Sequence, residues 1–165
     1  MWGIKNVFLC LLKQRINDIS LQNWHSEVSD MNRLNLYKLY KYSCTPESYI
    51  NKLEPYHKCL IANFRCTGLP LRSITGVYYE KINYDECFCK VCNNKIVENE
   101  FHFLLECSAY FLIRKAHIRE YFWNPPSLFK FQQFMNVDDV NTLNSLALYL
   151  KEALERRKLL IGDAN

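Results

Sequence analysis

Glycine is scarce in this sequence, with only 4 among 165 residues. Tight β-hairpin turns rely on glycine for backbone conformations that other residues avoid, so few hairpins are expected. The chain is 49% hydrophobic and 23% charged, which is typical of a globular protein and not of a disordered one. We therefore predict a mainly α-helical fold, with residues 1–165 forming a single domain.

Long apolar runs are also missing. No stretch approaches the ~20 apolar residues that a membrane-spanning helix needs. The apolar run 7–12 is too short for the core of a signal peptide, and the polar segment 13–15 follows it directly. The 8 cysteines would also suit a secreted disulfide scaffold, but a chain of this length can build its own core. We expect an intracellular protein, nuclear or cytoplasmic, with no membrane partner and with reduced thiols.

The sequence lacks the common catalytic motifs as well. It has no glycine-rich phosphate loop, and no serine, histidine and aspartate stand in a recognisable nucleophile context. Asp138 and Asp139 resemble part of a polymerase metal site, but Asn136 stands where that motif needs an aromatic residue. A helix cap at Asn136 explains both acids, because they then lie in the first turn. The chain is expected to have no catalytic activity.

Cysteine is concentrated in residues 87–107, which hold 4 of the 8 cysteines and 1 of the 4 histidines. The pattern is Cys89-x2-Cys92-x9-His102-x4-Cys107. Two cysteines separated by two residues can point their thiolates at one ion, and Zn²⁺ accepts mixed sulfur and nitrogen ligands in a tetrahedron. Four protein ligands leave no open position, so one structural zinc ion is predicted. The alternative is a set of buried thiols without a metal.

Helix geometry restricts how this site can form. Residues 98–106 are predicted to be helical, and residues five apart on an ideal α-helix are rotated by about 140°. His102 and Cys107 can therefore share an ion only if the helix ends or distorts at Cys107. Cys87 could compete as a ligand, but its Cys-x-Cys pair with Cys89 has poorer geometry, so we expect it to be a bystander. The predicted zinc knuckle, a short hairpin plus this helix, lies in the middle of the chain.

Apolar spacing and turn residues predict the remaining elements. The expected helices are 4–31, 46–53, 55–67, 98–106, 108–121, 128–134 and 136–158, with a hairpin turn at Asn93 and Asn94. The segment 4–31 is expected to form either one long helix or two helices joined near Ser20. Gly68 is expected to stop one helix, and Thr75 with Gly76 is expected to form a turn. Cys59 and Cys66 lie seven apart on one helix face and are expected to be buried.

A basic series on the third predicted helix and just beyond it is a candidate nucleic-acid interface. Lys58, Arg65 and Arg72 are spaced by seven, and Phe64 is nearby. Such side chains can contact phosphates, which adds affinity without sequence specificity. The alternative is an ordinary solvated face, because a net charge of +4 is only mildly basic.

Several segments together resemble a known family. They are residues 12–16, 23–25, 37–41, 62–66, 69–72, 75–76, 89–92 and 97–107, and Tyr110. Their order and spacing are similar to the zinc-binding domain in the C-terminal region of non-LTR (LINE-type) retrotransposon reverse transcriptases. The likeness runs from about residue 8 to residue 160, and the zinc segment is its most specific part.

The resemblance implies a function. Cys89, Cys92, His102 and Cys107 match the family's metal ligands, and the family's domain follows the polymerase core and helps to hold template RNA or target DNA. No polymerase core precedes this segment, so the chain looks like such a tail standing alone. The expected function is a zinc-stabilised, non-catalytic module whose partners are RNA or DNA and a reverse-transcriptase polymerase domain. The alternative is a structural or protein-interaction domain in which zinc only stabilises the fold.

Overall fold

The computed structural model describes residues 2–92 and 94–162. Contacts divide the chain into two compact units, Met1–Pro46 and Glu47–Asn165, and each is described by itself. Within the described residues, 70% of the chain is helical and no strand occurs, which confirms the mainly α prediction. The prediction of one domain over 1–165 stays a prediction.

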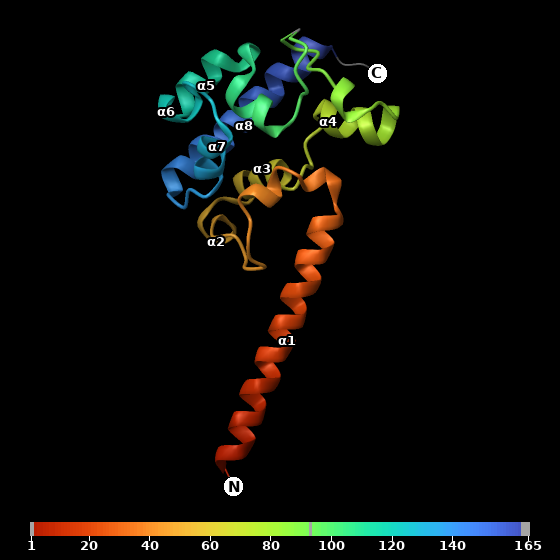
Figure 1. Cartoon of the computed structure of the whole chain (residues 1–165). Coiled ribbons are helices and arrows are strands. Elements are labelled where there is room, and N and C mark those ends of the chain that lie inside the picture. The colour runs from red at the N-terminus through yellow and green to blue at the C-terminus, as the bar shows by residue number, and fades with distance from the viewer. Residues whose placement is uncertain (1, 93, 163–165) are drawn as a thin grey trace. The chain divides into compact units, whose positions relative to one another are not determined.

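The first unit is built on one continuous helix. Helix α1 runs over Trp2–Asp30 without a break, close to the predicted 4–31 (Figure 1). Two 3₁₀ turns follow, η1 (Asn32–Leu34) and η2 (Tyr37–Leu39). Neither α1 nor any other helix among the described residues is long and apolar enough to cross a membrane.

The second unit holds the remaining helices in order along the chain. Its first elements are α2 (Tyr49–Lys52), α3 (Pro55–Arg65), α4 (Arg72–Thr75), the π-helix η3 (Gly76–Glu80) and the 3₁₀ turn η4 (Tyr84–Glu86). They are followed by the π-helix η5 (His102–Glu106), the 3₁₀ turn η6 (Ser108–Tyr110), α5 (Phe111–His117), α6 (Glu120–Trp123), α7 (Leu128–Met135) and α8 (Val140–Ile161). Helix α8, blue in Figure 1, packs against α3 and α5.

The core of this unit gathers around the ring of Phe103. Its centroid lies 4.9 Å from that of Tyr110, 5.9 Å from that of Tyr149 and 6.4 Å from that of Phe64, and all four side chains are buried. The hydroxyl of Tyr149 also donates to the Phe103 carbonyl at 2.5 Å. Because Phe103 belongs to η5, the aromatic core directly supports the segment that carries the predicted metal ligands.

The caps of the last two helices differ from the prediction. Helix α7 continues through Met135, and Asn136 is its C-terminal cap. Asp139 caps α8, because its carboxylate accepts the Thr142 backbone N–H at 2.8 Å. The predicted cap at Asn136 was therefore three residues too early.

Other helix boundaries also differ from the prediction. Helix α3 begins at Pro55 as predicted, but it ends at Arg65, before the expected stop at Gly68. Thr67, and not Gly68, takes a left-handed conformation, φ 57°. The predicted turn at residues 75–76 is wrong, since α4 runs directly into η3.

The two cysteines of the third predicted helix were also misplaced. Cys59 and Cys66 are both exposed, so their predicted burial is wrong. Their shared face is turned away from the core of the second unit.

Candidate metal centre

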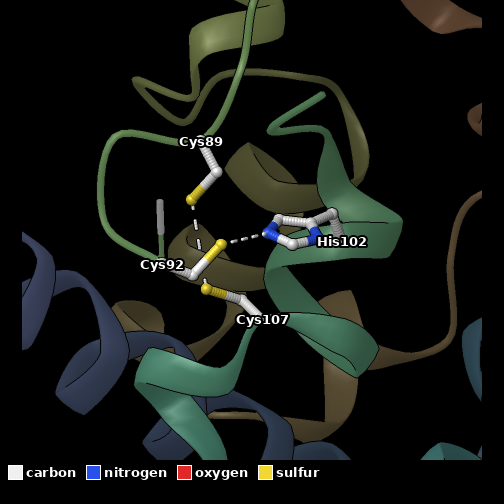
Figure 2. Close-up of side chains that lie close together, drawn as sticks. All are labelled: Cys89, Cys92, His102 and Cys107. Carbon is white, nitrogen blue, oxygen red and sulfur yellow. Dashed lines mark hydrogen bonds between the residues drawn. The ribbon is translucent and has the colours of Figure 1, made fainter. Parts of the chain in front are cut away.

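The structure brings the four predicted metal ligands together (Figure 2). The ligand atoms of Cys89, Cys92, His102 and Cys107 all lie within 4.8 Å of one another. The Sγ atoms of Cys89 and Cys107 are 4.0 Å apart, and Cys92 Sγ is 3.4 Å from His102 Nε2. A tetrahedral zinc ion would set these separations at about 3.8 Å for sulfur to sulfur and about 3.6 Å for sulfur to nitrogen. The four residues therefore fit a metal ion.

The site is shielded from solvent on most sides. Cys89, His102 and Cys107 are buried, and Cys92 is half-buried. Buried thiols and an imidazole are costly to desolvate, and an ion that accepts all four donors offsets that cost.

The π-helix η5 allows His102 and Cys107, five residues apart, to point to the same side of the helix. The Cys107 N–H donates to the His102 carbonyl at 2.8 Å, a bond from residue i+5 to residue i. The wider turn brings the two side chains to one side, and Cys107 then leaves the helix at φ −56° and ψ 121°. The distortion that the sequence required at Cys107 is confirmed. Single π-turns of this kind are rare and often lie at functional sites.

Two side chains hold the ends of η5 in place. At its start, the His102 N–H donates to the Asn99 side-chain oxygen at 2.9 Å. At its end, Arg114 donates from Nε to the Leu104 carbonyl at 2.7 Å and from its guanidinium to the Cys107 carbonyl at 2.8 Å. Arg114 is buried and thus satisfies carbonyls that a helix terminus would leave without donors.

The imidazole ring of His102 is oriented by a carboxylate. Glu106 Oε2 lies 3.4 Å from His102 Nδ1, one helical turn along η5. Nε2 then faces Cys92 and the centre of the cluster. An acid on the far nitrogen of a metal-binding histidine fixes the ring and increases its basicity.

The segment that carries Cys89 and Cys92 is closed by a short backbone pairing. Phe88 and Val97 form an isolated antiparallel bridge, and the Cys89 N–H donates to the Ile96 carbonyl at 2.9 Å. The predicted hairpin is thus reduced to one bridge. Its predicted turn includes Asn93, which lies outside the described residues.

Behind the cluster, Glu98 links three parts of the fold. Its carboxylate accepts two hydrogen bonds from Arg157 of α8, at 2.9 and 2.8 Å, and one from the Arg72 backbone N–H at 2.9 Å. Its Oε1 also lies 3.9 Å from Cys89 Sγ. The Glu98 side chain is fully buried. Sequence reasoning did not single out Glu98 or Arg157, because nothing in the sequence pairs two residues 59 positions apart.

The thiols are not equivalent acids in the absence of an ion. The hydrogen bond that Cys107 gives to Cys89 lowers the pKa of Cys89 and raises the pKa of Cys107. Burial raises the pKa of Cys92. Thiol protons must leave when a metal binds, so metal affinity should rise with pH.

Cys87 lies outside the cluster. Its thiol is buried and donates to the Asn83 carbonyl at 3.4 Å. It also packs against Gly76, where a Cβ atom would lie 2.6 Å from the Cys87 sulfur. Cys87 therefore fills a packing position beside the knuckle, in keeping with the bystander role expected for it.

Arg65, a predicted phosphate contact, is placed unfavourably for that role. Its side chain is 4% exposed and forms an ion pair with Glu47 at 2.7 Å. The guanidinium also donates to the Met135 carbonyl and lies 5.0 Å from the centre of the Tyr49 ring. Arg65 therefore ties α3 to its neighbours within the second unit, and its burial does not fit the predicted contact with nucleic acid.

Arg72 is in a similar position, and Lys58 differs. The Arg72 side chain is 8% exposed and forms an ion pair with Glu80, so it too presents little charge to a phosphate. Lys58 is half-buried and donates to the Ile50 carbonyl at 3.0 Å. The predicted phosphate contact of Arg72 does not fit this structure, and that of Lys58 stays a prediction.

No protein-family model, curated protein or solved structure matches this chain. The resemblance to the retrotransposon zinc-binding domain therefore stays a prediction.

Proposed function

We propose that this chain is a zinc-stabilised, non-catalytic module that binds nucleic acid. The observation that carries the proposal is the buried cluster of Cys89, Cys92, His102 and Cys107. Three thiolates and an imidazole at these separations suit Zn²⁺. They would fill its tetrahedral shell and leave no position for a substrate or an activated water.

The ion would act by joining two segments that are otherwise weakly held. Cys89 and Cys92 lie on a segment with little regular structure, whereas His102 and Cys107 bracket η5. The latter segment rests on the aromatic core through Phe103. Structural zinc contributes on the order of 10–16 kcal/mol in isolated finger peptides, so the ion can decide whether this region folds.

Nucleic-acid binding is supported by two independent observations. The segments that resemble the retrotransposon domain include all four predicted metal ligands, and that family's domain helps to hold template RNA or target DNA. In addition, Lys90 and Lys95 are exposed on the segment that carries the cysteine ligands. They supply positive charge next to the metal, where Arg65 and Arg72 do not.

Metal removal tests the first half of the proposal. A chelator or Cys92→Ser should release the ion and reduce the helical circular dichroism signal, because η5 and its contacts lose their anchor. Cys59→Ser is the matched control, since Cys59 is an exposed cysteine outside the cluster. Full retention of the spectrum after chelation, with zinc shown to be gone, would contradict a structural role for the ion.

Titration with RNA and DNA oligonucleotides tests the second half. Binding should be measurable at low salt and should weaken steeply as salt is added, because phosphate contacts release counterions. Absence of binding at low salt by the zinc-loaded chain would contradict the proposal.

A protein-interaction domain is the second candidate, and one surface favours it. Phe111, Leu112, Tyr121 and Phe129 are exposed along α5, α6 and α7. Exposed apolar side chains in this number often mark a docking surface. A chain that needs zinc to fold but binds neither RNA nor DNA would favour this function, with a polymerase domain as the expected partner.

A further inference from the structure

Four aromatic side chains are exposed in the segment that leads into the metal cluster and at its edge. Tyr78, Tyr79, Tyr84 and Phe88 all lie within eleven residues of sequence and are 45%, 80%, 45% and 40% exposed. Burial of a large aromatic side chain is worth a few kcal/mol, so a group of exposed rings close in sequence is a candidate contact surface for a ligand.

Packing places this aromatic segment against the knuckle. The thiol of Cys87 fills the space beside Gly76, the first residue of η3, so η3 starts next to the segment that leads into Cys89. Farther along η3, the pKa of Glu80 is lowered, chiefly by its hydrogen bond from Arg72 and also by the charge of Lys90. The start of η3 therefore packs against the segment that leads into Cys89. We treat the exposed side chains of residues 78–95 together as one surface.

The charges on this surface are mixed, with an excess of cations. Lys81, Lys90 and Lys95 are exposed, and they outnumber the exposed acids Asp85 and Glu86 by one. Glu80 is excluded from this count because Arg72 neutralises it. So small an excess of charge is a weak basis for binding a duplex through phosphates alone, since each phosphate contact requires a cation.

We propose that this surface binds single-stranded RNA or DNA by stacking unpaired bases on Tyr79 and Phe88. Lys90 and Lys95 hold the phosphates that adjoin the stacked bases. Every base offers a flat face to an aromatic ring, but bases inside a duplex are covered by their neighbours and are out of reach. The inference rests on the proposed function and adds the class of ligand and the residues that contact it.

Two properties of the binding follow from this arrangement. Affinity should depend on the two rings at any salt concentration, because stacking is not a charge interaction. With Lys90 and Lys95 at the phosphates, the slope of log affinity against log salt should be about −1.4, from the value of about −0.7 per phosphate for single strands.

The experiment uses the zinc-loaded full chain and fluorescence anisotropy with short mixed-sequence oligonucleotides. The probes are single-stranded RNA, single-stranded DNA and the matching duplex. Tyr79→Leu and Phe88→Leu should each weaken single-strand binding by a factor between about 5 and about 150, the range expected for one lost base stack. Phe129→Leu is the matched control, because Phe129 is a ring on α7 whose exposure, 64%, lies between those of Phe88 and Tyr79.

Charge is tested by a second pair of variants. Lys90→Gln combined with Lys95→Gln should reduce the magnitude of the salt slope by about 1.4. Lys115→Gln, at an exposed lysine of α5, should leave the slope unchanged. Zinc content and circular dichroism of each variant show that the knuckle is intact.

The outcomes separate this inference from the proposed function. Single-strand binding that survives both Tyr79→Leu and Phe88→Leu, or equal affinity for the duplex, would overturn the stacking surface and leave nucleic-acid binding standing. No binding of any probe by the zinc-loaded parent chain would overturn both.

Discussion

Arg157→Met should lower the stability of the second unit by about 3–5 kcal/mol, the cost of removing one partner from a buried ion pair. Arg157 reaches from α8 to Glu98, directly behind the metal cluster. Its side chain is 12% exposed and that of Glu98 is 0% exposed, so water cannot replace the lost partner.

The hydrogen bonds of Arg157 predict a similar loss of stability. Arg157 gives the carboxylate two hydrogen bonds, at 2.9 and 2.8 Å. Hydrogen bonds to charged groups contribute about 1.5–3 kcal/mol each, so the pair amounts to about 3–6 kcal/mol. Methionine keeps much of the apolar stem of arginine, so the loss of packing is small. Glu98 would keep the Arg72 N–H as a donor, but its charge would be unpaired and 3.9 Å from the sulfur of Cys89.

The assay is urea unfolding followed by circular dichroism at a fixed concentration of free zinc, so that metal binding contributes equally to every variant. Arg156→Met is the matched control, because Arg156 is the exposed neighbour on the same helix and should change stability by less than about 0.5 kcal/mol. Combining Arg157→Met with Glu98→Gln should recover part of the loss, since no buried charge then remains. If Arg157→Met is as stable as Arg156→Met, the buried ion pair is not part of the native fold.

Three further predictions concern packing, helix capping and hydrogen bonds to buried backbone carbonyls. Gly76→Ala should cost about 1–3 kcal/mol, because its Cβ would lie 2.6 Å from the Cys87 sulfur, and Cys87→Ala in the same chain should restore stability without changing zinc content. Asp139→Ala should lower the melting temperature more than Asn136→Ala does, and the reverse order would show that Asn136 caps α8 after all. The pKa of Asp139 is lowered, chiefly by the Thr142 N–H that it caps. The stabilisation from this cap is therefore present above the unfolded-state pKa of Asp139 and is lost as pH falls through its folded-state pKa. Arg114→Met should remove donors from two buried carbonyls beside the metal ligands and cost about 2–6 kcal/mol in the same urea assay, whereas an unchanged midpoint would show that these carbonyls find water.

The cluster of four candidate ligands could be predicted because its information is local. Four donors within residues 89–107 leave few ways to arrange a tetrahedral ion. The fixed rotation of an α-helix then required a distortion near Cys107, and the structure supplies it as a π-turn. Both steps use only chain geometry, which does not depend on what packs around the site.

The basic interface could not be predicted in this way, because spacing shows which residues share a helix face but not which face is buried. Arg65 at the end of α3 is buried, whereas Cys59 on α3 and Cys66 at its C-terminal cap are exposed, the opposite of what polarity suggests. The reason lies 18 residues upstream, where Glu47 provides a carboxylate for the guanidinium. An arginine with such a partner can be buried, and its long apolar stem then contributes to packing.

The prediction of where α7 ends and α8 begins failed for a related reason. Asn136 and Asp139 are both good N-terminal caps, so residue preference does not choose between them. The choice is made by α7, which extends through Met135 because Phe131, Phe134 and Met135 are all buried. The packing of α7 thus determines the start of α8, and packing cannot be read from preferences at the boundary.

The metal centre and the proposed stacking surface depend on the same backbone. Phe88 and Lys90 stand on either side of the ligand Cys89, and Phe88 is paired with Val97 in the bridge that closes the knuckle. An ion that fixes Cys89 therefore also fixes the position of a ring and a charge that face solvent. A metal ion at this site would thus act on the proposed binding without any chemistry of its own, because ordering the two contacts before the ligand arrives reduces the entropy that binding would otherwise cost.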